Sequence, residues 1–205
     1  MTTMKQEDFK TIIESNAQLI EQIKNSAHEL HASVNQTYDN NLPYGFHLDM
    51  VADSVYRYGH LVCDNPGDVL PLLFGAYYHD SIEDARLTYN DVRKTAAQFM
   101  DDDQALLAAE IAYALTNDKG RTRAERAGEK YYAGIRETPY APFVKLADRL
   151  ANISHSCTHG NQRMKKVYQE ELPHFLQAIT TTTNDDPRHS LPQPMIDAIM
   201  KLINE

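Results

Sequence analysis

The sequence VLPLLFGAYYHDSIEDA occupies residues 69–85, where an apolar segment runs directly into a cluster of charged side chains. Residues 69–78 are apolar nearly all round a helical projection, which is typical of a helix buried in the centre of a domain. His79-Asp80 and Glu83-Asp84 then place one imidazole and three carboxylates within six residues. If the helix continues, His79 and Glu83 lie one turn apart on one side. Carboxylates this close resist burial without a counter-charge, which a divalent metal ion would supply.

On both sides of this stretch, apolar residues return every three or four positions, which is the period of amphipathic helices. Asn, Asp, Pro, Gly and hydroxyl residues fill the intervening segments and predict loops, including one at residues 34–45. A capping box at residues 88–91 marks the start of one helix. No segment alternates like a strand, so the predicted fold is all-α. The predicted helices cover residues 7–31, 46–62, 68–79, 88–100, 104–115, 124–135, 143–157, 162–179 and 194–203.

The chain of 205 residues suits a single domain, with residues 1–183 forming it and residues 184–205 adding a linker and a helix packed on the same domain. A net charge of −9 argues against polymeric nucleic acid and anionic membranes as partners. No apolar run approaches the roughly 20 residues of a membrane span, and no signal-peptide core follows the first residues. We therefore expect a cytoplasmic protein, with Cys63 and Cys157 as reduced thiols.

Two other helices offer further metal ligands. His47 lies at the start of the helix predicted at residues 46–62, and His60, on the same helix, is its rival as first ligand. In the helix at residues 143–157, Asp148 shares one face with Lys145 and Asn152 at steps of three and four, opposite the apolar residues. A polar stripe on an otherwise buried helix indicates a site rather than a solvated surface.

These residues, in this order, resemble the motifs of a known family. The order His47, His79-Asp80, Asp148 resembles the H…HD…D pattern of HD-domain metal-dependent phosphohydrolases. The strings HDSIEDA at residues 79–85, followed by Thr88, and KLADRLAN at residues 145–152 are similar to the hydrolase domain of the RelA/SpoT family. The resemblance covers roughly residues 44–155.

The resemblance implies a single-domain helical HD-domain fold in which His47, His79, Asp80 and Asp148 bind one divalent ion, usually Mn²⁺. It further implies that Glu83 and Asp84 serve the attacking water and that Asn152 holds nucleotide or phosphate. The family reaction removes the 3′-pyrophosphate of guanosine tetra- and pentaphosphate. Independently of the family, imidazole with carboxylates suits Mn²⁺, Fe²⁺ or Co²⁺ better than Ca²⁺, and such ions activate water. No histidine occurs between Asp80 and His155, which favours one metal over two.

The sequence departs from the RelA/SpoT pattern at three places, one of which is the gap of 32 residues from His47 to His79, longer than usual. Where that family usually carries an Arg-Lys pair that holds guanine, this chain has Tyr38-Asp39, and where it often has Thr, this chain has His155. Basic residues cluster in the 119–130 segment, and Arg121 and Arg123 of this segment are candidate phosphate binders. Lys145 is a further candidate for binding the substrate.

The expected function is therefore that of a metal-dependent phosphohydrolase, with a (p)ppGpp-type 3′-pyrophosphate as the leading substrate. Two alternatives stay open. One is a mononuclear HD phosphatase or phosphodiesterase that acts on another nucleotide or phosphate ester. The other is a catalytically silent HD module that binds a nucleotide or a protein partner. The sequence does not indicate the oligomeric state.

Overall fold

The computed structural model describes residues 2–39, 41–117, 121–159, 161–181 and 185–204, without the side chains of residues 123 and 124. The chain is helical almost throughout, so the all-α prediction is confirmed, with one small two-stranded hairpin in addition. The helices are α1 (Gln6–Ser15), α2 (Ala17–Ser33), α3 (Gly45–Tyr58), α4 (Val69–Tyr78), α5 (Tyr89–Ala96), α6 (Asp102–Ala114), α7 (Arg123–Arg126), α8 (Glu129–Glu137), α9 (Ala141–Thr158), α10 (Gln162–Ile179) and α11 (Gln193–Asn204). Short 3₁₀ turns are η1 (Gly59–Leu61), η2 (Pro66–Asp68) and η3 (Pro187–His189), and the hairpin strands are β1 (Thr37–Tyr38) and β2 (Leu42–Pro43).

Helix α4 is the centre of the fold, as its apolar sequence predicts. Every residue of α4 is buried, and the helix packs against α2, α3 and α6. A Cβ atom on Gly75 would lie 2.5 Å from Cγ2 of Ile111, so only glycine allows α4 and α6 to approach this closely. The buried position of α4 carries its last residues, and the charged cluster that follows them, into the interior.

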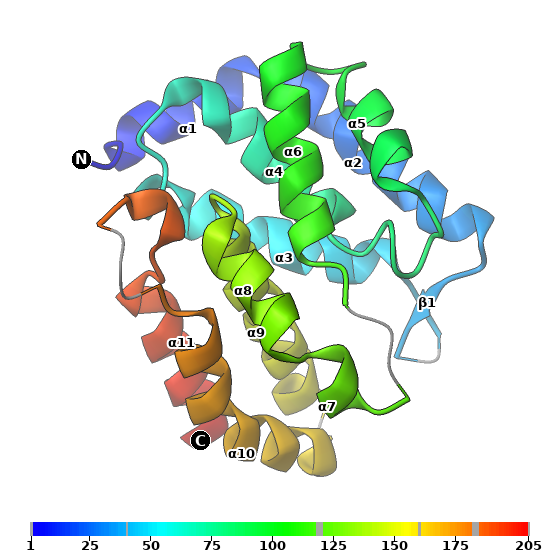
Figure 1. The fold of residues 1–205 in the computed structure, drawn as a ribbon, viewed down its shortest axis with the longest axis vertical. Helices are drawn as coiled ribbons and strands as arrows, with labels where there is room; N and C mark the ends of the chain where they lie inside the picture. Colours follow the sequence, from blue (N-terminus) through cyan, green and yellow to red (C-terminus); the bar gives the residue numbers. More distant parts are fainter. Residues whose placement is uncertain (1, 40, 118–120, 160, 182–184, 205) are drawn as a thin grey trace.

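The helices form two groups with α3 between them (Figure 1). Helices α1, α2, α4, α5 and α6 lie in the upper part of the view, and α8 to α11 lie in the lower part. Helix α9 packs along α3, and α10 and α11 pack on α9. The end of α4, the start of α3 and the middle of α9 therefore meet where the two groups join.

Several segments differ from the helices predicted by periodicity. The helix expected at 46–62 gives way to the 3₁₀ turn η1 after Tyr58, and the helix expected at 124–135 is divided into α7 and α8. The helix expected at 7–31 is broken at Asn16, whose side-chain amide bonds to the Ile12 carbonyl and competes with the helical backbone. The loop expected at 34–45 contains the β1–β2 hairpin, paired Thr37 to Pro43 and Tyr38 to Leu42. The helix after Thr88 begins with the predicted capping box but ends at Ala96.

The end of α4 agrees with the predicted helix at residues 68–79 to within one residue, and the turns that follow it matter most for function. The α-helix stops at Tyr78, because the Ser81 hydroxyl and the Ser81 amide both donate to the Tyr78 carbonyl. Residues 79–84 form successive turns rather than a continued helix. The His79–Glu83 relationship expected from an unbroken helix is therefore not how these side chains are placed.

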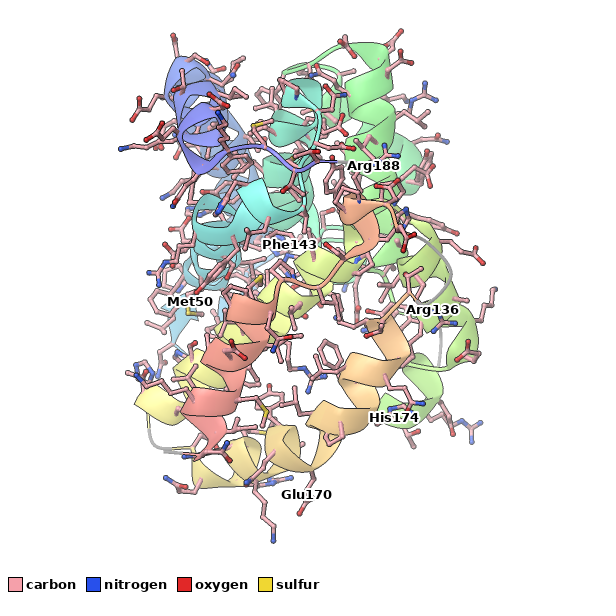
Figure 2. The ribbon with its side chains drawn as sticks, turned by 90° about the vertical axis from the view of Figure 1, so that its left-hand side faces the viewer. Met50, Arg136, Phe143, Glu170, His174 and Arg188 are labelled. Carbon is pink, nitrogen blue, oxygen red and sulfur yellow. The ribbon has the colours of Figure 1, made fainter. Side chains whose placement is uncertain are left out.

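The C-terminal helix α11 packs against α9 and α10 through its apolar face. Met195, Ile199 and Ile203 are the buried residues of that face. Figure 2 shows α10 and α11 side by side below the group of helices that contains α1, α2 and α4. Arg136 of α8 and His174 of α10 lie on the same side of the molecule in this view. Within the described part of the chain, no helix combines the length and the apolar character that crossing a bilayer requires.

Candidate metal centre

Two histidines and two carboxylates from three separate elements converge on one point. Helix α3 supplies His47, the turn after α4 supplies His79 and Asp80, and α9 supplies Asp148. His79 Nε2 lies 2.9 Å from Asp80 Oδ2 and 3.3 Å from His47 Nε2, which in turn lies 3.5 Å from Asp148 Oδ1. The structure thus brings together all four residues that the sequence predicts as ligands.

The donor set fits a divalent ion of the middle of the first transition row. Two imidazole nitrogens with two carboxylate oxygens are ligands that such ions take. His79 Nδ1 lies 2.9 Å from the Ala76 carbonyl, to which it donates, so its Nε2 faces the centre. A metal-ligating histidine is commonly oriented by such a bond. Of the described residues, His47 rather than His60 joins His79 and Asp80 in this cluster.

The two histidines of the centre differ in protonation. Burial lowers the pKa of His47, so that its ring is neutral at physiological pH. Burial also disfavours charge on His79, but the Asp80 carboxylate outweighs it and raises the pKa of His79 to about 9. The metal-free centre therefore stores a proton on His79 that a bound cation would displace.

Lys145 and Asn152 both hold Asp148. Lys145 Nζ lies 2.9 Å from Asp148 Oδ2, and Asn152 Nδ2 donates to Asp148 Oδ1 at 2.6 Å. Burial alone would lower the pKa of Lys145, but the Asp148 carboxylate raises it above the ordinary value of a lysine. Burial alone would raise the pKa of Asp148, but Lys145 keeps it below the ordinary value of an aspartate. The two residues predicted to bind substrate therefore orient a carboxylate of the centre in this structure, and both also line the adjoining pocket.

Tyr44 links the Asp80 ligand to one of the predicted catalytic acids. Its hydroxyl lies 2.5 Å from Asp80 Oδ2 and 3.0 Å from Asp84 Oδ2. Burial and the Asp80 charge raise the pKa of Asp84 to about 6. Glu83 turns away toward Asn117, whose side-chain amide donates to Glu83 Oε2 at 2.7 Å. Asp84 is therefore more closely coupled to the centre than Glu83.

Sequence reasoning did not select Tyr44, although a signal for it exists. Tyr44 precedes His47 by three residues, and residues three apart on a helix share a face. Behind Tyr44 lies His31, which is fully buried, stacked on the Tyr44 ring at 4.5 Å, and without a hydrogen-bond partner among the described residues.

The hairpin β1–β2 covers one side of the centre, whereas the sequence analysis noted Tyr38 and Asp39 only as a departure from the pattern of the family that the chain resembles. Tyr38 Oη donates to Asn152 Oδ1 at 2.9 Å, and the Tyr38 ring lies nearly parallel to that of His47, with 5.0 Å between centroids. Asp39 Oδ2 lies 2.7 Å from His155 Nε2. No sequence periodicity relates the hairpin to α9, so no signal in the sequence pairs these residues.

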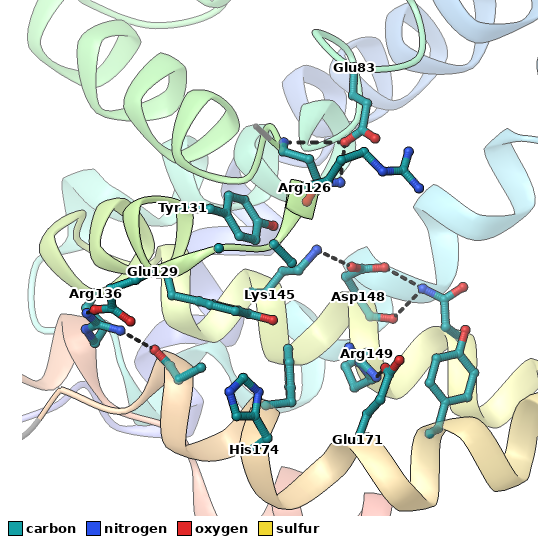
Figure 3. Close-up of a pocket in the computed structure, with 18 of the residues that line it drawn as sticks. Glu83, Arg126, Glu129, Tyr131, Arg136, Lys145, Asp148, Arg149, Glu171 and His174 are labelled. Atoms are coloured by element: carbon teal, nitrogen blue, oxygen red, sulfur yellow. Dashed lines mark hydrogen bonds and ion pairs between the residues drawn. The ribbon is translucent and has the colours of Figure 1, made fainter. Parts of the chain in front are cut away.

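A pocket of about 1360 Å³ opens from the other side of the centre (Figure 3). Asp80 and Asp148 form its inner wall, and it continues between α8 and α10. Arg149 pairs with Glu171 at 2.9 Å in that outer part, and its guanidinium lies 4.2 Å from the centroid of the Phe175 ring. The charged residues that line the pocket are Asp80, Glu83, Asp84, Arg126, Glu129, Arg136, Lys145, Asp148, Arg149 and Glu171.

Of the basic residues in the 119–130 segment, Arg126 lines the pocket, whereas the sequence analysis selected Arg121 and Arg123. Arg126 lines the pocket on the side of Glu83, as Figure 3 shows. Arg121 is exposed and is not among the lining residues, and its backbone amide donates to Glu125. The side chain of Arg123 and all of Lys119 lie outside the described residues.

The fold and the centre together define an all-α chain with a two-histidine, two-carboxylate site at the wall of a large polar pocket. No protein-family model matches the chain, and no curated protein matches it at a significant level.

Proposed function

We propose that this chain is a metal-dependent phosphohydrolase of the HD-domain kind, which holds one divalent ion, preferably Mn²⁺, through His47, His79, Asp80 and Asp148. The observation that carries the proposal is the convergence of these four side chains, with every consecutive pair of donor atoms between 2.9 and 3.5 Å apart. Such an ion, when bound, supplies charge for phosphate oxygens and lowers the pKa of a water molecule.

The chain's own residues suggest how protons move in this reaction. Asp84, with a pKa of about 6, can take a proton near neutral pH and return it to a leaving group. The Tyr44 hydroxyl remains protonated because burial and Asp80 raise its pKa far above 10, so it donates to the two carboxylates. Lys145 and Asn152 hold Asp148 in place. Glu83 is exposed and bonds to Asn117 in the lining of the pocket, which supports a role in contact with water rather than with the centre.

The pocket supports a nucleotide as the substrate rather than inorganic phosphate or a small ester. Its volume of about 1360 Å³ exceeds the range of roughly 300–1,000 Å³ common for small-ligand sites. Arg126 and Lys145 in its lining suit phosphate oxygens. We propose a guanosine 3′-pyrophosphate of the (p)ppGpp type as the first substrate to test.

One observation favours the alternative of a mononuclear phosphatase that acts on a different nucleotide. The hairpin position that carries a basic pair in the RelA/SpoT pattern holds Tyr38 and Asp39 here, and both are engaged with α9 through Asn152 and His155. A nucleobase held in the outer pocket between α8 and α10 would then meet different residues. A hydrolysis screen that compares 3′-pyrophosphorylated nucleotides with 5′-mono-, di- and triphosphates and cyclic nucleotides separates the two substrates.

The decisive experiment compares the purified chain with Mn²⁺ against its Asp80→Ala variant in that screen. We expect phosphate or pyrophosphate release from at least one nucleotide, and a loss of at least about 10³-fold in Asp80→Ala, because a ligand of the centre is removed. Asp53→Ala, which loses only an exposed pair with Arg57, is the matched control. Activity that survives in Asp80→Ala, or after chelation, contradicts the proposal. Stoichiometric metal without turnover on any nucleotide favours a catalytically silent module.

A further inference from the structure

The hairpin β1–β2 is too short to hold its position by its own pairing. Each strand has two residues, and an isolated two-stranded hairpin is marginal in water even when it is longer. Its place over the centre must therefore come from contacts outside the hairpin. The contacts of Tyr38 and Asp39 reach elements that carry metal ligands: Tyr38 lies on His47 of α3, and Tyr38 and Asp39 bond to Asn152 and His155 of α9.

Tyr38 touches the support of two ligands at once. Its ring stacks on His47 at 5.0 Å with an interplanar angle of 19°. Its hydroxyl bonds to Asn152, whose amide holds Asp148 Oδ1 at 2.6 Å. His47 and Asp148 come from different helices, and Tyr38 is the residue of the hairpin that connects their positions.

The orientation of the His47 ring depends on a neighbouring side chain such as Tyr38. Most metal-ligating histidines are oriented by a hydrogen bond from the second ring nitrogen. His79 has that bond, to the Ala76 carbonyl, but His47 Nδ1 is buried with no hydrogen-bond partner among the described residues. Ring packing is what orients the His47 imidazole, with Tyr38 parallel to it and Tyr44 edge-on at 5.5 Å.

A contact between Asp39 and His155 joins the hairpin to α9 in addition to the bond from Tyr38 to Asn152. Asp39 Oδ2 lies 2.7 Å from Nε2 of His155, and the Tyr38 ring meets the His155 ring edge-on at 4.8 Å. His155 is buried, while the Asp39 side chain is 46% exposed. Asp39 can therefore be changed with little disturbance of the core.

We propose that the hairpin is a clasp for the metal centre, in which Tyr38 positions His47 and Asp148, and the Asp39–His155 pair holds the clasp closed. The inference rests on the proposed metal site, but not on any particular substrate. Tyr38 is a positioning residue, because it acts through His47 and Asn152 and not on a reacting group. Loss of supporting contacts of this kind commonly weakens metal affinity 10–100-fold.

The test is the affinity of the metal-free protein for Mn²⁺, measured by isothermal titration calorimetry, together with its thermal midpoint before metal is added. We expect Tyr38→Leu to bind Mn²⁺ at least about tenfold more weakly, because the ring over His47 and the Asn152 bond are both lost. Tyr38→Phe keeps the ring and should recover most of the affinity. Tyr113→Leu, at an exposed tyrosine of α6, is the control.

A second variant, Asp39→Gly, keeps the proposal testable if Tyr38→Leu does not fold. Asp39 has a φ of 44°, which glycine adopts without strain, so Asp39→Gly removes the carboxylate while its backbone conformation remains allowed. We expect a loss of affinity of about threefold or more. Asn35→Gly is the matched control, because Asn35 is exposed, has a φ of 56° and precedes the hairpin.

The outcomes separate the clasp from the metal site itself. If the unchanged protein binds no divalent ion, the proposed metal site is wrong. If it binds Mn²⁺ and both Tyr38→Leu and Asp39→Gly bind it equally well, the centre stands and the clasp is wrong. Weaker binding in both variants, with unchanged thermal midpoints of the metal-free proteins and unchanged controls, supports the clasp.

Discussion

Asp39 and His155, which lie 116 residues apart in the sequence, are joined by a contact of 2.7 Å between Oδ2 and Nε2. This contact joins the hairpin β1–β2 to α9. A substitution at either position therefore removes the same contact between the two elements.

Replacement of Lys145 by methionine should destabilise the metal-free protein more than the Mn²⁺-loaded one. Lys145 is the cation paired with the mostly buried Asp148 carboxylate, and leaving a buried charge without its partner costs about 3–5 kcal/mol. A bound ion would compensate for that charge. Urea unfolding with and without Mn²⁺ measures the difference, and an equal loss in both states would show that no cation reaches Asp148.

Binding of Mn²⁺ should release close to one proton at pH 7. The pKa of His79 in the metal-free protein is about 9, so His79 carries a proton at neutral pH that must leave before Nε2 can bind an ion. Affinity should therefore rise about tenfold per pH unit from pH 7 and level off near pH 9. Calorimetry in buffers of different ionisation enthalpy counts the protons. A pH-independent affinity between pH 7 and 9 contradicts this assignment of His79.

Asp84→Asn should lower turnover by about 10²–10⁴-fold, the usual contribution of a general acid or base, while Mn²⁺ affinity stays within about threefold. Asp84 contacts the centre through Tyr44 and is not itself one of the converging ligands. As a base it must be ionised, so the rate of the unchanged protein should rise with pH through about 6. The variant should lack that rise. Glu83→Gln is the comparison, and we expect the smaller loss there because Glu83 points toward Asn117.

His31→Phe should make the protein more resistant to acid. Burial lowers the pKa of His31 to about 4, whereas the unfolded chain has an ordinary histidine near 6.5. The unfolded state therefore binds the extra proton, and the stability that comes from neutral His31 is complete above pH 6.5 and is lost as the pH falls toward 4. The loss is of the order of 2–3 kcal/mol.

Phenylalanine keeps the stacking on Tyr44 and removes two buried nitrogens that have no partner in the described part of the chain. Denaturant unfolding of the metal-free proteins at pH 7 and pH 4 should show a smaller difference for His31→Phe than for the unchanged chain. An identical difference in both proteins would place the acid sensitivity elsewhere.

The sequence by itself determined the helical class and the central place of α4, and it offered His79, Asp80 and Asp148 as candidate ligands, with His60 as the rival of His47. Each of these depends on local information: the period of apolar residues, an uninterrupted apolar run, and side chains that are costly to bury alone. The same local reasoning placed Lys145, Asp148 and Asn152 on one face of α9, where the structure has them bonded together.

Only the tertiary structure decided how the centre is held and where it opens. The bonds from Tyr38 to Asn152 and from Asp39 to His155 depend on how α3 and α9 pack, and periodicity along the chain says nothing about contacts between residues more than 100 positions apart. The arrangement of residues 79–84 was likewise left open by the sequence, because a side-chain hydroxyl, that of Ser81, bonds there to a backbone carbonyl. In the turns that follow, Asp84 bonds to Tyr44 beside the centre, whereas Glu83 bonds to Asn117.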